Sequence, residues 1–220
     1  GIPCLCAVNR DIPAKLRKSL WENNVPAILT SGTLMAGNSF NRTRETMGLS
    51  TDTETFTAPS PFNYMDNCLL YIPEDIPQFT MGSDAEISYL SRQICSLIKA
   101  AHGHTLVLFT SYFLMGAVYS KVKDIIPFPL MAAWRNSNDA VSKFKEAKNA
   151  VLFSAGSCWE GMDFPGNIVS SLIIPRLPFP VPDPLSKAKR TNYPTLHDYI
   201  QSVVVPDMQI KLRQGFGRAI

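Results

Sequence analysis

The chain alternates between short apolar runs and amphipathic segments, a pattern typical of alternating strands and helices. Continuous apolar runs predict strands of a parallel sheet that is covered on both faces. They are VPAILTS (25–31), CLLYIP (68–73), TLVLFTS (105–111), FPLMAA (128–133), AVLFSAGS (150–157) and VSSLIIPRL (169–177). Apolar residues at helical spacing predict helices over 12–23, 84–102, 112–125 and 137–148. The alternation indicates an α/β fold with a mainly parallel, doubly wound sheet.

Capping residues indicate where two of these helices begin and end. Asp11 precedes a segment with Pro13 in its first turn, which is typical of a helix N-terminus. Ser83 and Glu86 form a capping box before the second helix, and Gly103 is expected to end it.

Two stretches interrupt the regular pattern. Residues 38–61 are rich in Thr, Ser, Asn and Pro, a composition that favours a linker. Five prolines between residues 175 and 184 exclude regular structure and predict a stiff surface loop. A last helix is expected to begin near Pro206 and to contain the cluster KLRQGFGRAI (211–220).

Composition places the chain among globular proteins. Of its 220 residues, 45% are hydrophobic and 18% are charged, a balance that excludes an intrinsically disordered chain. No apolar run approaches the roughly 18–20 residues of a membrane-spanning helix, and the first residues lack the pattern of a signal peptide. We therefore expect a cytoplasmic protein without a membrane partner. The net charge of +3 is too small to indicate nucleic-acid binding by itself.

The cysteines and histidines give no sign of a metal site or a disulfide framework. The five cysteines are odd in number and scattered, and no second pair follows Cys4 and Cys6 at ligand spacing. The three histidines have no metal-ligand partner beside them. We expect no metal to be bound by these residues.

Small hydroxyl residues and glycines follow three of the predicted strands. In parallel sheets, sites lie beyond the carboxyl ends of the strands, so these residues are the first candidates for binding. They are Thr30, Ser31, Gly32 and Thr33, then Thr110 and Ser111, then Ala155, Gly156 and Ser157. Backbone N–H groups and short hydroxyl side chains approach anions closely, which favours contacts to phosphates.

The motifs of a self-contained hydrolase are missing from the sequence. Gly156 and Gly161 have the glycine spacing of a phosphate-binding P-loop, but Met162 and Asp163 occupy its Lys and Ser/Thr positions. No G-x-S-x-G nucleophile elbow occurs. A self-contained hydrolase or metalloenzyme is therefore disfavoured.

An acidic turn and a basic helix remain as candidate chemistry. Glu160 and Asp163 lie in the turn WEGMDFPG. Gln214 and Arg218 are four residues apart, so on a helix they share a face and their donors converge on one target. An arginine beside small residues suits a bidentate phosphate contact. The alternative, which the sequence leaves open, is that Arg218 forms an ordinary ion pair with Asp163 or Glu160.

Five motifs occur in an order that resembles a known family. They are TSGTL (30–34), VLFTSY (107–112), SCWEGMDFPG (157–166), LPFPVPDPL (177–185) and QGFGRAI (214–220). Together they resemble the C-terminal part of a DinG-like helicase, of the XPD-type branch of superfamily-two DNA helicases. The resemblance extends over nearly the whole chain. It implies the second helicase domain, a RecA-like (P-loop NTPase-type) three-layer α/β sandwich with a mainly parallel sheet.

The resemblance also implies a division of the chain. Residues 1–50 look like the end of the first helicase domain, with Thr30, Ser31, Gly32 and Thr33 similar to the coupling motif III. Residues 51–220 look like the second domain, which stops within motif VI because the family pattern has a further arginine just beyond Ile220.

Roles for single residues follow from the resemblance. Gln214 and Arg218 are implied to act in catalysis, facing a nucleotide bound by the first domain. The remaining implied contacts are Glu160, Gly161, Asp163 and Gly217 for the nucleotide, and Thr110, Ser111 and Ser157 for the DNA backbone. ATP and Mg²⁺ are implied as cofactors that the first domain mainly binds, and an iron–sulfur cluster is not expected within these residues.

The resemblance implies an ATP-dependent motor that moves along single-stranded DNA, usually 5′ to 3′. Its partners are single-stranded DNA and the first helicase domain of the same chain. These 220 residues alone are expected to be inactive, because the P-loop and the Mg²⁺-binding acid are absent from them. The alternative is a non-catalytic nucleic-acid or protein-interaction module on a RecA-like scaffold.

Overall fold

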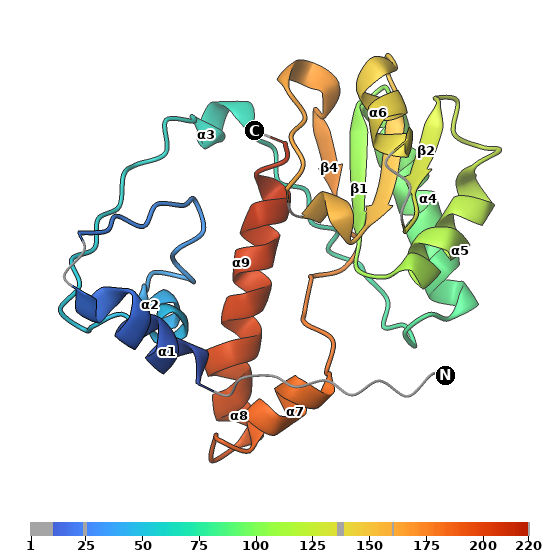
Figure 1. Ribbon diagram of the computed structural model, residues 1–220. Coiled ribbons are helices and arrows are strands. Elements are labelled where there is room, and N and C mark those ends of the chain that lie inside the picture. The colour runs from blue at the N-terminus through green and yellow to red at the C-terminus, as the bar shows by residue number, and fades with distance from the viewer. Residues whose placement is uncertain (1–10, 24–25, 136–138, 160, 220) are drawn as a thin grey trace.

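A parallel sheet forms the centre of the larger part of the molecule (Figure 1). The computed structural model describes residues 11–23, 26–135, 139–159 and 161–219. Within these residues the sheet has four parallel strands in the order β2-β3-β1-β4. They are β1 (Thr105–Phe109), β2 (Leu130–Ala133), β3 (Val151–Ala155) and β4 (Ser171–Ile173). The predicted parallel α/β fold is confirmed.

Alternate residues of the strands point to opposite faces of the sheet, and each face has its own apolar core. On one face, Val107 and Phe109 pack with the helices α4 (Asp84–Ala100) and α5 (Tyr112–Val122). On the other face, Leu106 and Leu108 pack with α6 (Asp139–Glu146) and with the turn that follows β3. Helices therefore cover both faces, as a strand that is apolar along its whole length requires.

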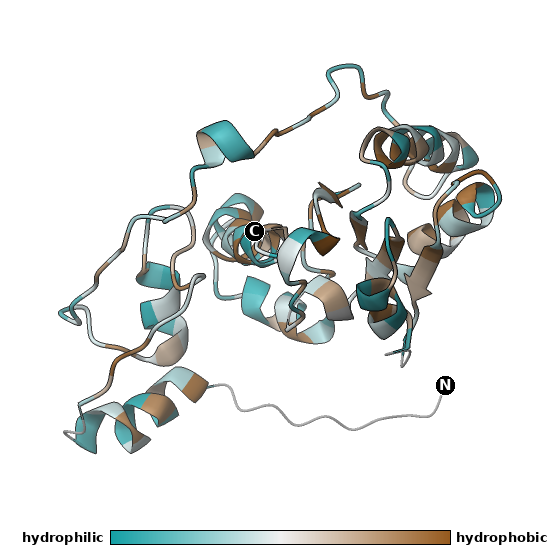
Figure 2. Ribbon diagram, turned by 90° about the horizontal axis from the view of Figure 1, so that it is seen from above, coloured by the Kyte–Doolittle hydropathy of each residue, from teal (hydrophilic) through white to brown (hydrophobic). Residues whose placement is uncertain are grey.

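The long helix α9 (Val205–Phe216) lies between the sheet and a group of short helices from the first third of the chain (Figure 1). Figure 2 shows the same arrangement from above. The first-third helices are α1 (Ile12–Ser19), η1 (Trp21–Asn23), α2 (Asn41–Met47) and α3 (Tyr64–Asn67). The elements that lead into α9 are α7 (Pro184–Arg190), α8 (Leu196–Tyr199) and the π-helical turn η4 (Ile200–Val204).

The predicted N-terminal caps are present, but the capping box of Ser83 and Glu86 is only half formed, because the Glu86 carboxylate accepts from the amide of Gly82 and not from that of Ser83. The Asp11 carboxylate accepts a hydrogen bond from the Ala14 amide, and α1 ends at Ser19 before the separate 3-10 turn η1. The Ser83 hydroxyl accepts from the Glu86 amide at the start of α4. The linker predicted over 38–61 is interrupted by α2, whose end at Gly48 packs against α1.

Two of the six predicted strands are wrong. Residues 26–31, the described part of VPAILTS, and residues 68–73 are irregular and exposed. Ile28 and Leu69 are each 93% exposed. A strand needs a neighbour for its backbone groups, and neither segment pairs with the sheet formed by residues 105–173 within the described part of the chain. The two segments are apolar, but no other part of the described residues buries them.

The proline-rich segment was predicted correctly, since residues 174–183 form an irregular loop between β4 and α7. Glu86 ties this loop to the start of α4, because its carboxylate accepts from Arg176 Nε at 2.9 Å and from the Gly82 amide at 2.6 Å. In the described ranges no helix combines the length and hydrophobicity that crossing a membrane requires.

Candidate functional site

Two of the predicted anion-binding turns lie side by side at the carboxyl edge of the sheet. Phe109 and Ala155 are register partners, so the residues that follow β1 and β3 emerge together. Thr110 is exposed, whereas the Ser111 hydroxyl accepts from the Leu114 amide at 3.2 Å and caps α5.

The backbone at Gly156 requires glycine. Its φ is +91°, and a Cβ there would lie 3.2 Å from the Tyr112 hydroxyl. Ser157 follows and opens the 3-10 turn η2 (Ser157–Trp159). The side chain of Ser157 and all of Glu160 fall outside the described residues, so the roles predicted for them stay predictions.

Trp159 joins the turn after β3 to both the sheet and α9. Its indole is 1% exposed and donates to the Phe109 carbonyl at 2.9 Å. On the other side of the ring lies Gly215 of α9, where a Cβ would meet Trp159 Cζ3 at 2.7 Å. Lys211 Nζ lies 5.8 Å from the ring centroid. The acidic turn and the C-terminal helix are therefore in direct contact.

Arg218 is held at this junction by backbone carbonyls. Its guanidinium donates to the carbonyl of Met162, and at 3.5 Å to that of Trp159, while its buried Nε has no partner among the described residues. Asp163 is exposed, and no ion pair between Arg218 and Asp163 occurs in the described part. The ion-pair alternative with Asp163 is therefore wrong, and the one with Glu160 lies outside the described residues.

Gln214 and Arg218 do not share a helix face. Helix α9 ends at Phe216, with Gly217 as its C-cap, so Arg218 lies in the turn beyond the helix. Gln214 instead lines a small open pocket of about 280 Å³ between α9 and the proline-rich loop, beside Pro178 and Lys211. The shared helix face that the i, i+4 spacing predicts does not form because the helix ends two residues before Arg218.

The segment similar to motif III lies apart from the sheet and is anchored through α2. The Ser31 hydroxyl accepts from the Thr33 amide at 3.2 Å, and Ser31 and Gly32 are exposed. Thr43 Oγ1 of α2 donates to the Leu34 carbonyl at 2.6 Å directly after the motif. Helix α2 therefore fixes the end of the segment.

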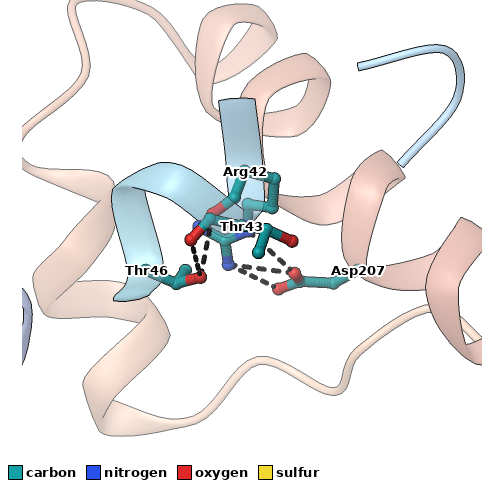
Figure 3. A network of polar contacts seen from close by, with 4 residues as sticks. All are labelled: Arg42, Thr43, Thr46 and Asp207. Carbon is teal, nitrogen blue, oxygen red and sulfur yellow. Dashed lines mark hydrogen bonds and ion pairs between the residues drawn. The ribbon is translucent and has the colours of Figure 1, made fainter. Parts of the chain in front are cut away.

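Helix α2 is in turn bound to α9 by a bidentate ion pair (Figure 3). Arg42 donates to the Asp207 carboxylate through Nε at 3.2 Å and through Nη2 at 2.9 Å. Within α2, Thr46 Oγ1 donates to the Arg42 carbonyl at 2.8 Å. A second link joins Arg213 of α9 to the Met35 carbonyl at 3.2 Å. Together these contacts connect the motif III segment to the helix that carries Gln214.

The site supplies cationic groups and backbone, and no metal-binding cluster. Within the described ranges, no group of three or more His, Cys, Asp or Glu side chains is placed to hold a metal ion. Asp183 is the N-cap of α7. Hydrogen bonds with the amide and the hydroxyl of Ser186 lower the pKa of its carboxyl.

Several residues of the site have no signal in the sequence. Arg42 and Asp207 are 165 residues apart in the chain, and nothing in their local context indicates that they pair. Trp159 lies inside a motif that attracts attention for its acids and glycines. Gly215 is a weak signal for this contact, because a glycine inside a helix often marks a place where a large side chain packs closely.

The chain matches one family model and is similar to several known proteins. The family model described as the helicase C-terminal domain matches residues 94–220, more than half of the chain. The ATP-dependent DNA helicase YoaA of Escherichia coli (strain K12) is 32% identical over 197 residues, which are 88% of this chain and 30% of that protein. The probable ATP-dependent helicase YpvA of Bacillus subtilis (strain 168) is 31% identical over 217 residues, 96% of this chain and 32% of its own length.

A third relative and a solved structure are also similar to this chain. The ATP-dependent helicase DinG of Mycobacterium tuberculosis (strain ATCC 25618 / H37Rv) is 31% identical over 198 residues, 88% of this chain and 30% of that protein. A solved XPD helicase structure aligns with a TM-score of 0.48 and 22% identity, covering 64% of this chain and 27% of that one. The chain thus spans about a third of the length of these curated relatives.

Proposed function

Because the chain belongs to the helicase C-terminal domain family, we propose that it is the second motor domain of a DinG/XPD-like ATP-dependent DNA helicase. One observation supports this assignment most strongly: the acidic turn and the C-terminal cluster meet at the guanidinium of Arg218. Met162 of the turn and Arg218 of the cluster are 56 residues apart in sequence, and a shared nucleotide site requires the two motifs to be adjacent.

The proposed nucleotide side consists of Gln214, Arg218 and the turn around Gly161 and Asp163. In phosphoryl transfer, one set of groups holds the phosphates and Mg²⁺, and an arginine delivered across an interface neutralises the charge that develops. Asp163 and Gly161 are exposed and Arg218 is partly exposed, as contact with a partner domain requires. The P-loop and the Mg²⁺ ligands belong to the first domain in this proposal.

The proposed DNA side is the edge of the sheet at Thr110, Ser111 and Ser157. Thr110 offers an exposed hydroxyl, and the start of α5 offers amides beside it. Ser111 already caps the helix, so its proposed contact with a phosphate is through the backbone. Thr30, Ser31, Gly32 and Thr33 are proposed to transmit nucleotide state to this surface through α2 and α9.

The first helicase domain is the proposed partner for the exposed apolar segments. Leu69, Leu70 and Ile72 are 93%, 79% and 68% exposed, and Ile28 is 93% exposed. Contiguous apolar residues at such exposure are typical of surfaces that another domain covers. The rest of the protein, which the curated relatives' lengths imply, is proposed to cover them.

Glutamine substitutions in the whole protein test the nucleotide assignment. Gln214→Ala is expected to lower the DNA-stimulated rate of ATP hydrolysis by roughly tenfold or more, the effect of about 1.4 kcal/mol in the barrier. Gln209→Ala is the matched control, because Gln209 lies on α9 one and a half turns earlier and is exposed. Equal rates for the two variants contradict the assignment and favour a non-catalytic module.

Salt titration tests the DNA assignment. The 220-residue chain is expected to bind single-stranded oligonucleotide weakly, with affinity that falls as salt rises because phosphate contacts release counterions. Fluorescence anisotropy at several salt concentrations measures this slope. Binding that is independent of salt, or absent at low salt, contradicts the proposal.

A further inference from the structure

A groove between α4 and α5 lies on the face of the sheet opposite the one against which Trp159 packs. It has a volume of about 560 Å³ and is open to solvent. One wall is a stripe of α4 and the other is the end of α5. The lining residues are Ser88, Ser91, Arg92, Cys95, Ser96, Lys99, Lys121, Val122 and Ile125.

The charges in this groove have one sign. Arg92 and Lys99 stand two turns apart on the α4 stripe, and Lys121 approaches from α5 with its Nζ 3.2 Å from the Ser88 hydroxyl. No Asp or Glu is among the residues that line the groove. Three cations without a carboxylate leave a local positive field, which favours an anionic ligand.

A buried hydroxyl at the bottom of the groove has no partner. Ser91 is 7% exposed, and its Oγ makes no hydrogen bond among the described residues. A buried hydroxyl without a partner costs about 1–3 kcal/mol, so such groups are rare unless a ligand or water completes them. An oxyanion between the three cations is a suitable acceptor for this donor.

We propose that the α4–α5 groove binds the phosphate group of a ligand, with Arg92, Lys99 and Lys121 as its cations and Ser91 as a buried donor. Val122, which is fully buried, lines the groove beside these groups. The proposal is independent of the assignment of Gln214 and Arg218, which contact the loop and turn on the other side of the sheet.

Cys95 provides a reporter inside the groove. Its thiol is partly buried, and burial raises its pKa while Lys99 opposes that shift. A phosphate bound beside it is expected to slow alkylation for two reasons: it shields the sulfur and it disfavours the thiolate that reacts. In the whole protein, mass spectrometry of the peptide that contains Cys95 measures the rate with iodoacetamide, separately from every other cysteine.

The experiment compares inorganic pyrophosphate, a single-stranded oligonucleotide and sodium chloride at equal ionic strength. We expect alkylation of Cys95 to slow at least about threefold with a phosphate ligand, through occlusion and loss of thiolate, and to be unchanged with chloride. Protection by pyrophosphate identifies a small phosphate ligand, and protection by the oligonucleotide alone identifies the nucleic-acid backbone. Absence of protection by both contradicts the proposal.

Variants separate binding from a structural role. Lys99→Ala and Lys121→Ala together are expected to abolish protection, whereas Lys123→Ala, an exposed lysine of the same helix end outside the groove, is expected to retain it. Ser91→Ala removes the unpartnered hydroxyl and is expected to weaken protection without lowering the stability of the fold. Protection that survives the double variant, or that is lost equally with Lys123→Ala, overturns the proposal.

Discussion

At the scale of single residues, one glycine sets how closely α9 approaches the turn after β3. A Cβ at Gly215 would lie 2.7 Å from Trp159 Cζ3 and 3.2 Å from Leu108 Cδ1, distances that require the ring to move. Trp159 is held in place by its hydrogen bond to Phe109 and is fully enclosed. Gly215 is thus needed for contact, and not for an unusual backbone conformation.

The substitution Gly215→Ala is expected to lower the free energy of unfolding of the chain. Overpacking costs about 1–3 kcal/mol, which exceeds the gain of up to about 1 kcal/mol from the better helix propensity of alanine. Urea denaturation measures the difference. Gly217→Ala is the control, because its Cβ would meet its nearest neighbours at 3.5 and 3.6 Å, and it is expected to be neutral or slightly stabilising. Destabilisation by both substitutions alike contradicts a specific clash with Trp159.

At the scale of elements, α9 is the helix on which the separate parts of the molecule converge. Arg42 of α2 binds Asp207 near its start, and Tyr64 of α3 packs on Phe216 at its end with ring centroids 5.9 Å apart. Trp159 lies against its last turn through Gly215. A change in the position of α9 therefore displaces the motif III segment and the acidic turn together.

A double-mutant cycle tests the link between α2 and α9. The Arg42 and Asp207 side chains are 18% and 38% exposed, so the coupling free energy of Arg42→Ala and Asp207→Ala is expected at about 1 kcal/mol, the upper end for exposed pairs, and it should decrease with added salt. The pair Asp139 and Lys143 within α6 serves as the control, because both side chains are mostly exposed, and its coupling should be smaller. A coupling no larger than that of the control pair contradicts a fixed α2–α9 contact.

Some elements were predicted correctly from the sequence and others were not. Segments whose partners lie nearby in the chain were predicted correctly, as for the strands Thr105–Phe109 and Val151–Ala155 with the helices between them. The apolar runs at 26–31 and 68–73 have the same local pattern but no neighbouring strand, and an apolar pattern does not specify what will bury it. The same limit explains the site: the motifs indicated Arg218, but its backbone partners depend on where α9 ends.

At the scale of the whole molecule, the described residues supply one half of a proposed site. They bring Arg218 and a turn with an exposed acid to one junction and place Gln214 beside the proline-rich loop, and the sequence contains no P-loop. The chain is about a third as long as its curated relatives, and the complementary half is proposed to lie in the remainder of such a protein. The chemistry is therefore proposed to take place at an interface between two domains.

Steady-state ATP hydrolysis by the whole protein with Arg218→Ala tests this claim most directly. An arginine that acts on the transition state predicts a loss in kcat of roughly a thousandfold with little change in KM, while Lys187→Ala, which removes an exposed cation of α7, should retain activity. Circular dichroism checks that both variants are folded. If Arg218→Ala leaves kcat within about threefold of the unmodified protein, the arginine contributes less than about 1 kcal/mol to the barrier and the central claim is wrong.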